Sequence, residues 1–456
     1  MERQQWKRIL LGSAGNLVEW FDWFVYASFA VYFAGAFFPQ GDPTAQLMNT
    51  AGIFAVGFFM RPVGGWLLGR VADRRGRKTA LTLSVTLMSA SALLIAVAPT
   101  HAVAGYGGAA VLLVARLLQG LSVGGEYAAG ATYLTEVSDP RRRGFASSFQ
   151  YVSMTAGQIL GLGLLILLQL TLSEADLHAW GWRIPFALGA LGAAVVFWLR
   201  RSMTETAVYE ESADTAPAAA GEAKGTLKAL WAYKREAFLV IALTMGGTVA
   251  YYTYTSYLTR YLSNSAGLDK QTATLVSFCA LIVFAAIQPL AGHLSDRIGR
   301  RPLLIGFAVG STLLTVPLMA LLRHAGSFWP ALALTLIALF VVTGYTSINA
   351  CVKAELFPTG IRALGVALPY AIANALFGGT AEYVALWFKN AGVEAGYSWY
   401  VAGCAAVSLV VYVGMRETRD LDLNRPGGDT DRDGSGRPGR SGRSGDEPAA
   451  VPTGTR

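Results

Sequence analysis

Cysteine and histidine are scarce in this chain of 456 residues, which contains three cysteines and four histidines. Cys279, Cys351 and Cys404 are isolated in apolar surroundings, and no two cysteines have the C-x-x-C spacing of a metal or redox site. The histidines are scattered in the same way. These scarcities argue against a disulfide framework and a metal centre, and we expect neither a metal ion nor another cofactor.

Charge is scarce as well. Charged residues make up 14% of the chain and hydrophobic residues 53%, and the mean hydropathy is +0.42. A soluble domain carries about 25% charged residues, so this composition excludes a soluble globule. The apolar runs are about 20 residues or longer, enough for a helix to cross a ~30 Å hydrocarbon core. We predict an all-α membrane protein with twelve transmembrane helices. The predicted spans are 10–36, 46–68, 79–98, 108–135, 145–170, 181–200, 237–261, 271–292, 302–323, 329–354, 363–388 and 396–415.

The net charge of +8 does not indicate nucleic-acid binding, because the basic residues gather in alternate loops. One side of the predicted membrane carries most of them, for example Lys7, Arg141 and Arg301, whereas the other side carries few, such as Arg260 and Lys389. Cytoplasmic loops are enriched in Lys and Arg, so we expect both termini in the cytoplasm. The first apolar run is too long and too acidic for a signal peptide.

One basic stretch occurs twice in the chain. Gly69–Lys78 reads GRVADRRGRK and Gly292–Arg301 reads GHLSDRIGRR, so Asp73 corresponds to Asp296, 223 residues later. In both places an apolar run leads into the stretch and another leads out. Repeated halves of apolar helices are typical of secondary transporters.

A second repeat supports the same division, because Glu136 and Arg143 recur as Glu355 and Arg362 at an offset of 219 residues. We predict that the repeated residues form a gate on the cytoplasmic side, although helix capping and membrane topology explain the second repeat equally well. The predicted gate residues are Gly69, Asp73, Arg77, Asp296, Arg300, Glu136, Arg143, Glu355 and Arg362. The predicted divisions are a first six-helix half (1–200), a central loop (201–236), a second six-helix half (237–415) and a disordered tail (416–456).

The first predicted span contains two acids, Glu19 and Asp22, which share a helix face because they are three residues apart. Each charge at the bilayer centre costs about 2.5–3.5 kcal/mol. These acids must therefore face a wet cavity, pair with a cation or carry a proton. Arg61 and Arg116 lie at a suitable depth in the predicted membrane. The alternative to a functional role for the acids is therefore a pair of fixed ion pairs, Glu19–Arg61 and Asp22–Arg116. Glu126 is a third membrane acid.

Later spans also present polar side chains. Tyr251 and Tyr254 lie on one face of the seventh span, where they could bind an anion or belong to an interfacial aromatic belt. Tyr345, Asn349 and Lys353 form a stripe along the tenth span. Lys353 could line a cavity or extend to the membrane surface. The further candidates for a polar cavity are Gln150 and Asn374.

The repeated stretch resembles the loop motif of the major facilitator superfamily. Gly15–Trp23, Phe59–Gly65, Arg116–Tyr127 and Gly181–Phe186 resemble the metabolite:proton symporter branch of that superfamily. The resemblance extends from about residue 9 to about residue 415. The stretches that most resemble the members carrying 2-oxoglutarate are Ser148–Val152, Lys353–Pro358 and Ala373–Leu386.

This resemblance implies a monomeric proton symporter in a bacterial cytoplasmic membrane that imports 2-oxoglutarate or a similar dicarboxylate by alternating access. Proton coupling is then expected at Asp22, with Glu19 and Glu126 as further candidates. Arg116, Lys353 and Arg61 would bind the two substrate carboxylates, with Tyr251, Tyr254, Asn349, Gln150 and Asn374 as further contacts. The alternatives are a symporter for citrate, shikimate, proline or betaine, and a membrane sensor of metabolites. The sequence shows no nucleophile and base of an enzyme.

Overall fold

The apolar runs fold into long helices, because a bilayer interior offers backbone N–H and C=O groups no partner outside the helix. The computed structural model describes residues 3–38, 43–201, 205–206, 209, 225–419 and 421. The long helices of the first half are α1 (Arg3–Phe37), α2 (Pro43–Arg75), α3 (Arg77–Ala96), α5 (Gly107–Glu136), α6 (Arg143–Thr171) and α8 (Arg183–Arg200). The short elements between them are α4 (His101–Ala104), η1 (Pro140–Arg142), α7 (Glu174–Asp176) and η2 (Leu177–Gly181).

The second half is also helical in its described residues, but three of its predicted spans are interrupted. α12 (Lys234–Tyr252) continues through the π-helical turn η3 (Thr253–Tyr257) into α13 (Leu258–Asn264). The tenth span divides into α16 (Phe328–Thr346) and α17 (Asn349–Glu355). The eleventh runs from α18 (Arg362–Ala373) through the π-helical turn η4 (Asn374–Gly378) into α19 (Ala381–Asn390). The uninterrupted helices are α14 (Lys270–Ile298), α15 (Arg300–Arg323) and α20 (Ala395–Gly414).

The predicted number of spans is confirmed. Ten helical stretches of the described residues are long and apolar enough to cross a membrane. The remaining two long helices are α1, with 35 residues, and α2, with 33 residues. At 1.5 Å per residue each is about 50 Å long, more than a bilayer core requires. Together these elements make the all-α fold with twelve transmembrane helices.

The repeated basic stretch is not the loop that the sequence suggested. Its first part is the last turn of α2 or α14, and its second part is the first turn of α3 or α15. Only one residue separates the helices in each case, Gly76 with φ of 95° and Gly299 with φ of 101°. A residue with a Cβ atom rarely adopts this left-handed backbone conformation, which explains why glycine stands at this point of both copies.

Each half also contains close helix crossings, and that of α2 against α5 is an example. A Cβ atom added at Gly124 would overlap the backbone of Arg61, and one added at Gly64 would overlap the backbone of Leu121. Such close approach is possible only for very small residues. The crossing holds Arg61 and the polar residues of α5 deep inside the bundle.

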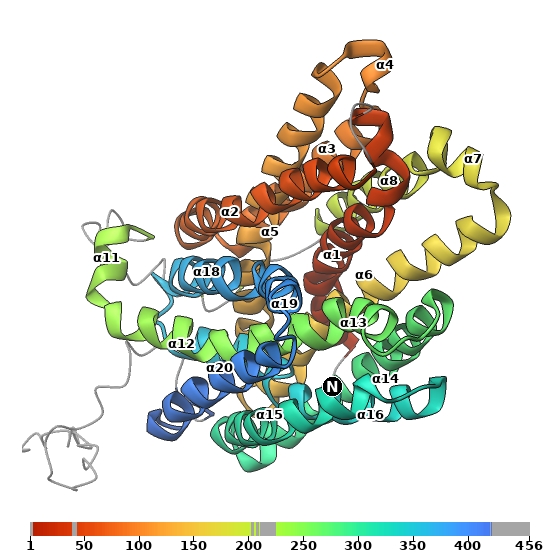
Figure 1. The fold of residues 1–456 in the computed structure, drawn as a ribbon. Coiled ribbons are helices and arrows are strands. Elements are labelled where there is room, and N and C mark those ends of the chain that lie inside the picture. Colours follow the sequence, from red (N-terminus) through yellow and green to blue (C-terminus); the bar gives the residue numbers. More distant parts are fainter. Residues whose placement is uncertain are drawn as a thin grey trace, which may run out of the picture.

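The two groups of helices meet along two main contacts. α6 packs against α14, and α2 packs against α18, while α5 touches both α17 and α18. Figure 1 shows the helices of the first half, coloured red to yellow, gathered on one side of the molecule and the green to blue helices on the other. Long helices from both halves therefore enclose the centre of the molecule.

The predicted central loop is partly helical, because α11 (Leu227–Ala232) precedes α12. Residues 210–224, both ends of the chain and almost all of the predicted disordered tail lie outside the described residues. The predictions about those segments therefore remain predictions.

Candidate functional site

Asp22 lies in the middle of α1 and is fully buried. Its Oδ2 atom accepts a 2.9 Å hydrogen bond from Gln119 Nε2, and the Oε1 atom of Gln119 accepts one from Arg116. The Oδ1 atom of Asp22 has no hydrogen-bond partner among the described residues. Asp22 is thus connected to Arg116 through Gln119, and the direct Asp22–Arg116 ion pair that the sequence left open is not formed.

Two guanidinium groups lie over the indole ring of Trp23. The Cζ atom of Arg61 is 4.1 Å from the ring centroid of Trp23, and that of Arg116 is 4.2 Å from it. Aromatic faces attract cations at such distances. Arg61 Nη1 also donates to the hydroxyl of Tyr252 on α12 at 3.3 Å. Its Nε and Nη2 atoms are buried without a hydrogen-bond partner among the described residues.

Two further acids lie near Asp22 in the first half. Glu126 forms an ion pair with Arg200 and accepts a hydrogen bond from Ser84. Arg200 is fully buried. Glu19 Oε1 is hydrogen-bonded to the hydroxyl of Ser122, and the alternative pair Glu19–Arg61 is not among the ion pairs of the described residues.

Lys353 lies at the contact between the halves and is fully buried, so it does not extend to the membrane surface. Its Nζ atom is 2.9 Å from Asn349 Oδ1 and 3.3 Å from the hydroxyls of Tyr127 and Tyr345. The ring centroid of Tyr370 lies 4.3 Å from the same atom. No carboxylate of the described residues forms an ion pair with Lys353. The faces of these phenol rings attract the ammonium ion. The ammonium ion can also attract an anion.

The other predicted cavity residues differ in their surroundings. Asn374 is buried, and both its amide oxygen and its amide nitrogen lack a hydrogen-bond partner among the described residues. The hydroxyls of Tyr251 and Tyr254 also lack one. Gln150 donates to Asn16 at 3.2 Å and joins α6 to α1, and its amide oxygen also lacks a partner among the described residues. Buried polar atoms without partners point to water or a ligand, which is consistent with all four as cavity residues.

The predicted gate residues lie together at one end of the bundle, which we call the Asp73 end. The carboxylate of Asp73 accepts backbone hydrogen bonds of 3.0 and 2.9 Å from Ala363 and Leu364, in the first turn of α18. Arg77 Nη1 donates to Asp73 Oδ1 at 3.2 Å. A helix N-terminus carries partial positive charge and free N–H groups. Asp73 of the first half thereby binds a helix of the second half.

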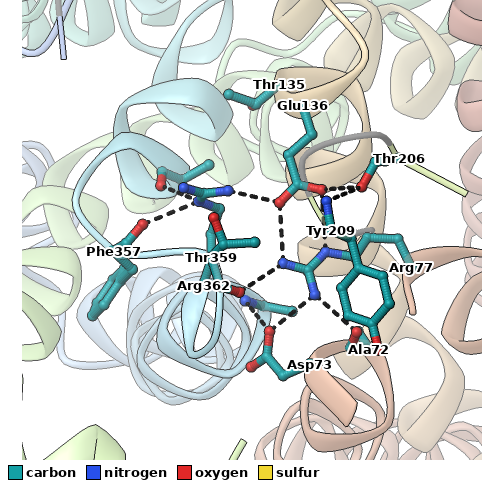
Figure 2. A network of polar contacts seen from close by, with 12 residues as sticks. Ala72, Asp73, Arg77, Thr135, Glu136, Thr206, Tyr209, Phe357, Thr359 and Arg362 are labelled. Carbon is teal, nitrogen blue, oxygen red and sulfur yellow. Dashed lines mark hydrogen bonds and ion pairs between the residues drawn. The ribbon is translucent and has the colours of Figure 1, made fainter. Parts of the chain in front are cut away.

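Glu136 completes this contact (Figure 2). It accepts hydrogen bonds from Arg77 at 3.0 Å, from Arg362 at 2.7 Å and from Thr206 at 2.6 Å. Both arginines are fully buried. Arg362 belongs to α18, so Glu136 is paired with an arginine of the other half and not with Arg143, seven residues ahead of it in the sequence.

The second copy of the motif makes the same contact in the opposite direction. Asp296 accepts hydrogen bonds of 2.8 and 2.9 Å from the backbone N–H groups of Gly144 and Phe145, in the first turn of α6. Arg300 Nη1 donates to Asp296 Oδ1 at 2.7 Å. Both copies therefore attach the end of one long helix to the start of a helix in the other half.

The motif glycines permit this approach. A Cβ atom at Gly69 would lie 2.9 Å from the Cα atom of Leu364, and one at Gly292 would lie 2.5 Å from the carbonyl oxygen of Gly144. Contacts this short require the backbone to move. Gly69 and Gly292 therefore set how closely α2 approaches α18 and how closely α14 approaches α6.

The second network is less complete than the first. Arg300 Nη2 and Glu355 Oε1 are 3.8 Å apart, and neither atom has a hydrogen-bond partner among the described residues. Thr418 donates to the other oxygen of Glu355 at 2.6 Å. Arg143 donates to the carbonyl oxygen of Leu421 at 2.9 Å. The segment after α20 thus occupies the place where Arg143 would meet Glu355.

Two acids that the sequence analysis missed hold the helix starts beside these networks. Glu205 accepts hydrogen bonds of 3.0 and 3.1 Å from the first two residues of α3, and Glu417 accepts bonds of 2.8 and 3.0 Å from the first two of α15. Burial raises the pKa of the Glu417 carboxyl, but its four backbone N–H donors outweigh burial and lower that pKa. The dipeptide Glu-Thr recurs at an offset of 212 residues, a signal that could have identified both acids.

Comparisons with known proteins agree on the family and the fold. Residues 9–425 match the family described as Sugar (and other) transporter. The chain is 48% identical over 403 residues to the alpha-ketoglutarate permease of Escherichia coli (strain K12), which covers 88% of this chain and 92% of the relative. It is 32% identical over 403 residues to the citrate-proton symporter of Salmonella typhi, with coverage of 88% and 91%. The proton:xylose symporter XylE from E. coli has the same fold, with a TM-score of 0.73, 18% identity and coverage of 92% and 98%.

The position of Asp73 predicts how its amide variant behaves. In Asp73→Asn one N–H group of α18 faces an amide NH2 group, so the contact between the halves weakens. A carboxylate at a partly buried helix N-terminus contributes up to ~2 kcal/mol, a factor of about 5–30 in the equilibrium between closed and open Asp73 ends. We expect a slower transport rate with nearly unchanged substrate affinity, measured by uptake and by equilibrium binding.

Asp269→Asn is the matched control. Asp269 also accepts a hydrogen bond from a helix N-terminus, the N–H of Thr272 at 2.9 Å, but it is exposed and binds its own helix. A normal transport rate in Asp73→Asn would show that this contact does not serve as a gate.

Proposed function

The chain belongs to the Sugar (and other) transporter family, within the major facilitator superfamily, and we propose that it is a proton-coupled symporter for 2-oxoglutarate or a similar dicarboxylate. The identity of 48% to a protein named alpha-ketoglutarate permease supports this substrate class. The expected site follows from the positions of the buried cations and acids.

Two buried cations without a carboxylate partner carry the proposal. Arg61 and Lys353 are 1% and 0% exposed, and neither takes part in an ion pair among the described residues. Burying an unpaired charge is unfavourable, so such cations indicate a site for an anion. Arg61 comes from the first half and Lys353 from the second. A dicarboxylate has one carboxylate for each.

This arrangement suits alternating access. Arg61 already touches the second half through Tyr252, and Lys353 touches the first half through Tyr127. Tyr370 lies beside Lys353, and the charge of Arg61 also acts on its hydroxyl group. A substrate held from both sides is bound fully only when the halves close around it, which links occupancy to the rocking of one half against the other.

Arg116 has a different role in this proposal from the one first expected. It contacts Gln119 and the face of Trp23, which places it beside the proton site at Asp22. A proton on Asp22 would change the charge beside Arg116 and thus the field at the neighbouring Arg61. Arg116 remains a candidate for substrate contact, but Arg61 and Lys353 are the stronger pair.

We place the Asp73 end on the cytoplasmic side of a bacterial inner membrane, with both termini in the cytoplasm and the protein acting as a monomer without catalytic activity. The excess of basic residues near this end supports the orientation. With its Asp73 end closed by the paired networks, the described conformation is not open to the cytoplasm.

Uptake by the purified protein in proteoliposomes tests this function. Labelled 2-oxoglutarate should accumulate when the outside is more acidic, and unlabelled 2-oxoglutarate should compete better than citrate, shikimate, proline or betaine. A zwitterion such as betaine offers one carboxylate for two cations and should compete poorly. Binding of 2-oxoglutarate without uptake would favour a membrane sensor, and stronger competition by another compound would change the substrate.

Lys353, which lies among the phenol rings of Tyr127, Tyr345 and Tyr370, gives a first variant. A hydrogen bond to a charged group contributes about 1.5–3 kcal/mol, so Lys353→Gln should weaken 2-oxoglutarate binding about tenfold to a hundredfold. A monocarboxylate of similar size should lose less affinity. Lys389→Gln, at a partly exposed lysine that contacts Ser265, is the control and should bind normally. Unchanged 2-oxoglutarate affinity in Lys353→Gln would remove this lysine from the site.

Asp22 gives a variant for proton coupling. Asp22→Asn cannot release a proton, yet its amide can still bond to Gln119. We expect it to lose accumulation driven by a pH gradient and to retain exchange of labelled for unlabelled substrate, because exchange does not require an empty carrier to reorient. Normal accumulation by Asp22→Asn would place the coupling site elsewhere.

Asn374 gives a variant for the ketone group. Its unpartnered amide lies near Thr248 and Tyr252, since a Cβ atom at Gly378 would touch all three side chains. We expect the amide to donate to the 2-oxo oxygen. A neutral hydrogen bond contributes about 0.5–1.5 kcal/mol, so Asn374→Leu should bind 2-oxoglutarate up to about tenfold more weakly and glutarate, which lacks the ketone, as before. An equal loss for both compounds would contradict this role.

A further inference from the structure

Two buried acids on α1 have no cation as an ion-pair partner. Glu19 and Asp22 are 1% and 0% exposed, and none of the ion pairs among the described residues includes either of them. Glu126, by contrast, is paired with Arg200. An ionised carboxylate buried without such a partner is strongly disfavoured and tends to become neutral.

The hydrogen-bond geometry at Glu19 gives an independent indication. The hydroxyl of Ser122 lies 2.7 Å from the carbonyl oxygen of Ser84 and also contacts Glu19 Oε1. A serine hydroxyl has a single hydrogen but can also accept. If that hydrogen serves the carbonyl oxygen, Glu19 can bond to Ser122 only by donating a hydrogen of its own. A proton on Glu19 therefore satisfies both contacts at once.

The neighbouring acid Glu126 shows why the same argument does not apply there. Ser84 also has two acceptors, Glu126 and the carbonyl oxygen of Leu81. Arg200 donates to both of these acceptors, so the hydrogen of Ser84 is free to serve Glu126. Glu126 is thus fully partnered as an anion, and Glu19 is not.

The charged groups that face the two acids come from three helices. Glu19 is influenced by Glu126 on α5, Arg200 on α8 and Arg61 on α2. Of these, Arg200 is committed to Glu126, and Arg61 lies on the aromatic faces of Trp23 and Phe58. Asp22 is bonded to Gln119, which in turn bonds Arg116. The Oδ1 atom of Asp22 is left buried without a partner among the described residues and can hold a proton.

We propose that each transport cycle carries two protons with one substrate dianion, one proton on Asp22 and the other on Glu19. This inference rests on the proposed symport of a dicarboxylate. The charge balance gives it a physical reason. A dianion that enters with one proton moves a net negative charge into a cell that is negative inside. Each such charge lowers the accumulation ratio of the substrate about fiftyfold per 100 mV of membrane potential. Two protons make the step electrically neutral.

The two acids have different roles. Asp22 is bonded through Gln119 to Arg116, so its proton is linked to the cations near the substrate. Glu19 is bonded to Ser122 and lies one helical turn away, outside that connection. Loss of Asp22 therefore uncouples transport, whereas loss of Glu19 should leave coupling in place with one proton fewer.

The experiment measures the substrate ratio at which net flux stops, using the full-length protein in proteoliposomes with labelled 2-oxoglutarate. The membrane potential is fixed with potassium and valinomycin. At zero potential and a pH difference of one unit, flux should reverse at an about hundredfold substrate ratio for two protons and an about tenfold ratio for one. The wild-type ratio should be about a hundredfold and independent of the potential.

Glu19→Gln should reverse at about tenfold, and its ratio should change by about fiftyfold per 100 mV. Glu382→Gln, at a partly exposed acid paired with Arg260, is the control and should behave as wild type. A tenfold, potential-dependent ratio in the wild type would overturn the proposal, as would an unchanged ratio in Glu19→Gln. If that variant does not fold, the wild-type ratio still decides the number of protons. Absence of 2-oxoglutarate uptake by the wild type would instead refute the proposed function.

Discussion

The placement of charge inside an apolar bundle is the constraint on which this structure depends. Every ionised side chain there needs a partner, because water is not available to solvate it. At the Asp73 end the partners are complete in the first network, where Glu136 has two arginines and Asp73 has a helix N-terminus. At the centre they are incomplete, because neither Arg61 nor Lys353 takes part in an ion pair among the described residues. The first network at the closed end is therefore complete, whereas two central cations have no carboxylate partner in the described part of the chain.

The two networks at the Asp73 end share a design but differ in how completely their polar atoms are partnered. Both copies of the motif present an aspartate to a helix start in the other half, yet Glu136 receives an arginine from that half and Glu355 does not. Arg143 instead bonds to the segment after α20. Opening the Asp73 end must break both contacts, but the second already holds unpartnered atoms. The contact between α2 and α18 thus has the more complete polar network of the two.

The sequence predicted the parts of this arrangement that depend on local pattern. Twelve apolar runs indicated twelve spans, and the repeat at Asp73 and Asp296 indicated residues that meet at one end of the bundle. The sequence could not predict which charged residues pair, because Glu136 meets Arg362 only after the two halves of the chain have packed together. The interrupted helices were missed as well, since the π-helical turn at Asn374 leaves the apolar run unbroken.

The connection between the acids and the cations is carried by contiguous side chains. Asp22 bonds Gln119, Gln119 bonds Arg116, and Arg116 and Arg61 both lie over the ring of Trp23. Arg61 in turn bonds Tyr252, on a helix of the other half.

Such a chain can transmit a change only if it has two arrangements, and in the symport proposed above the protonation of Asp22 supplies them. An anionic Asp22 attracts Arg116 through the intervening amide, whereas a neutral Asp22 releases that attraction and leaves the cations on Trp23 more available to a substrate carboxylate. Proton binding and substrate binding then favour each other without direct contact. The same field acts in reverse, because a bound dianion near Arg61 makes it harder for Asp22 to lose its proton.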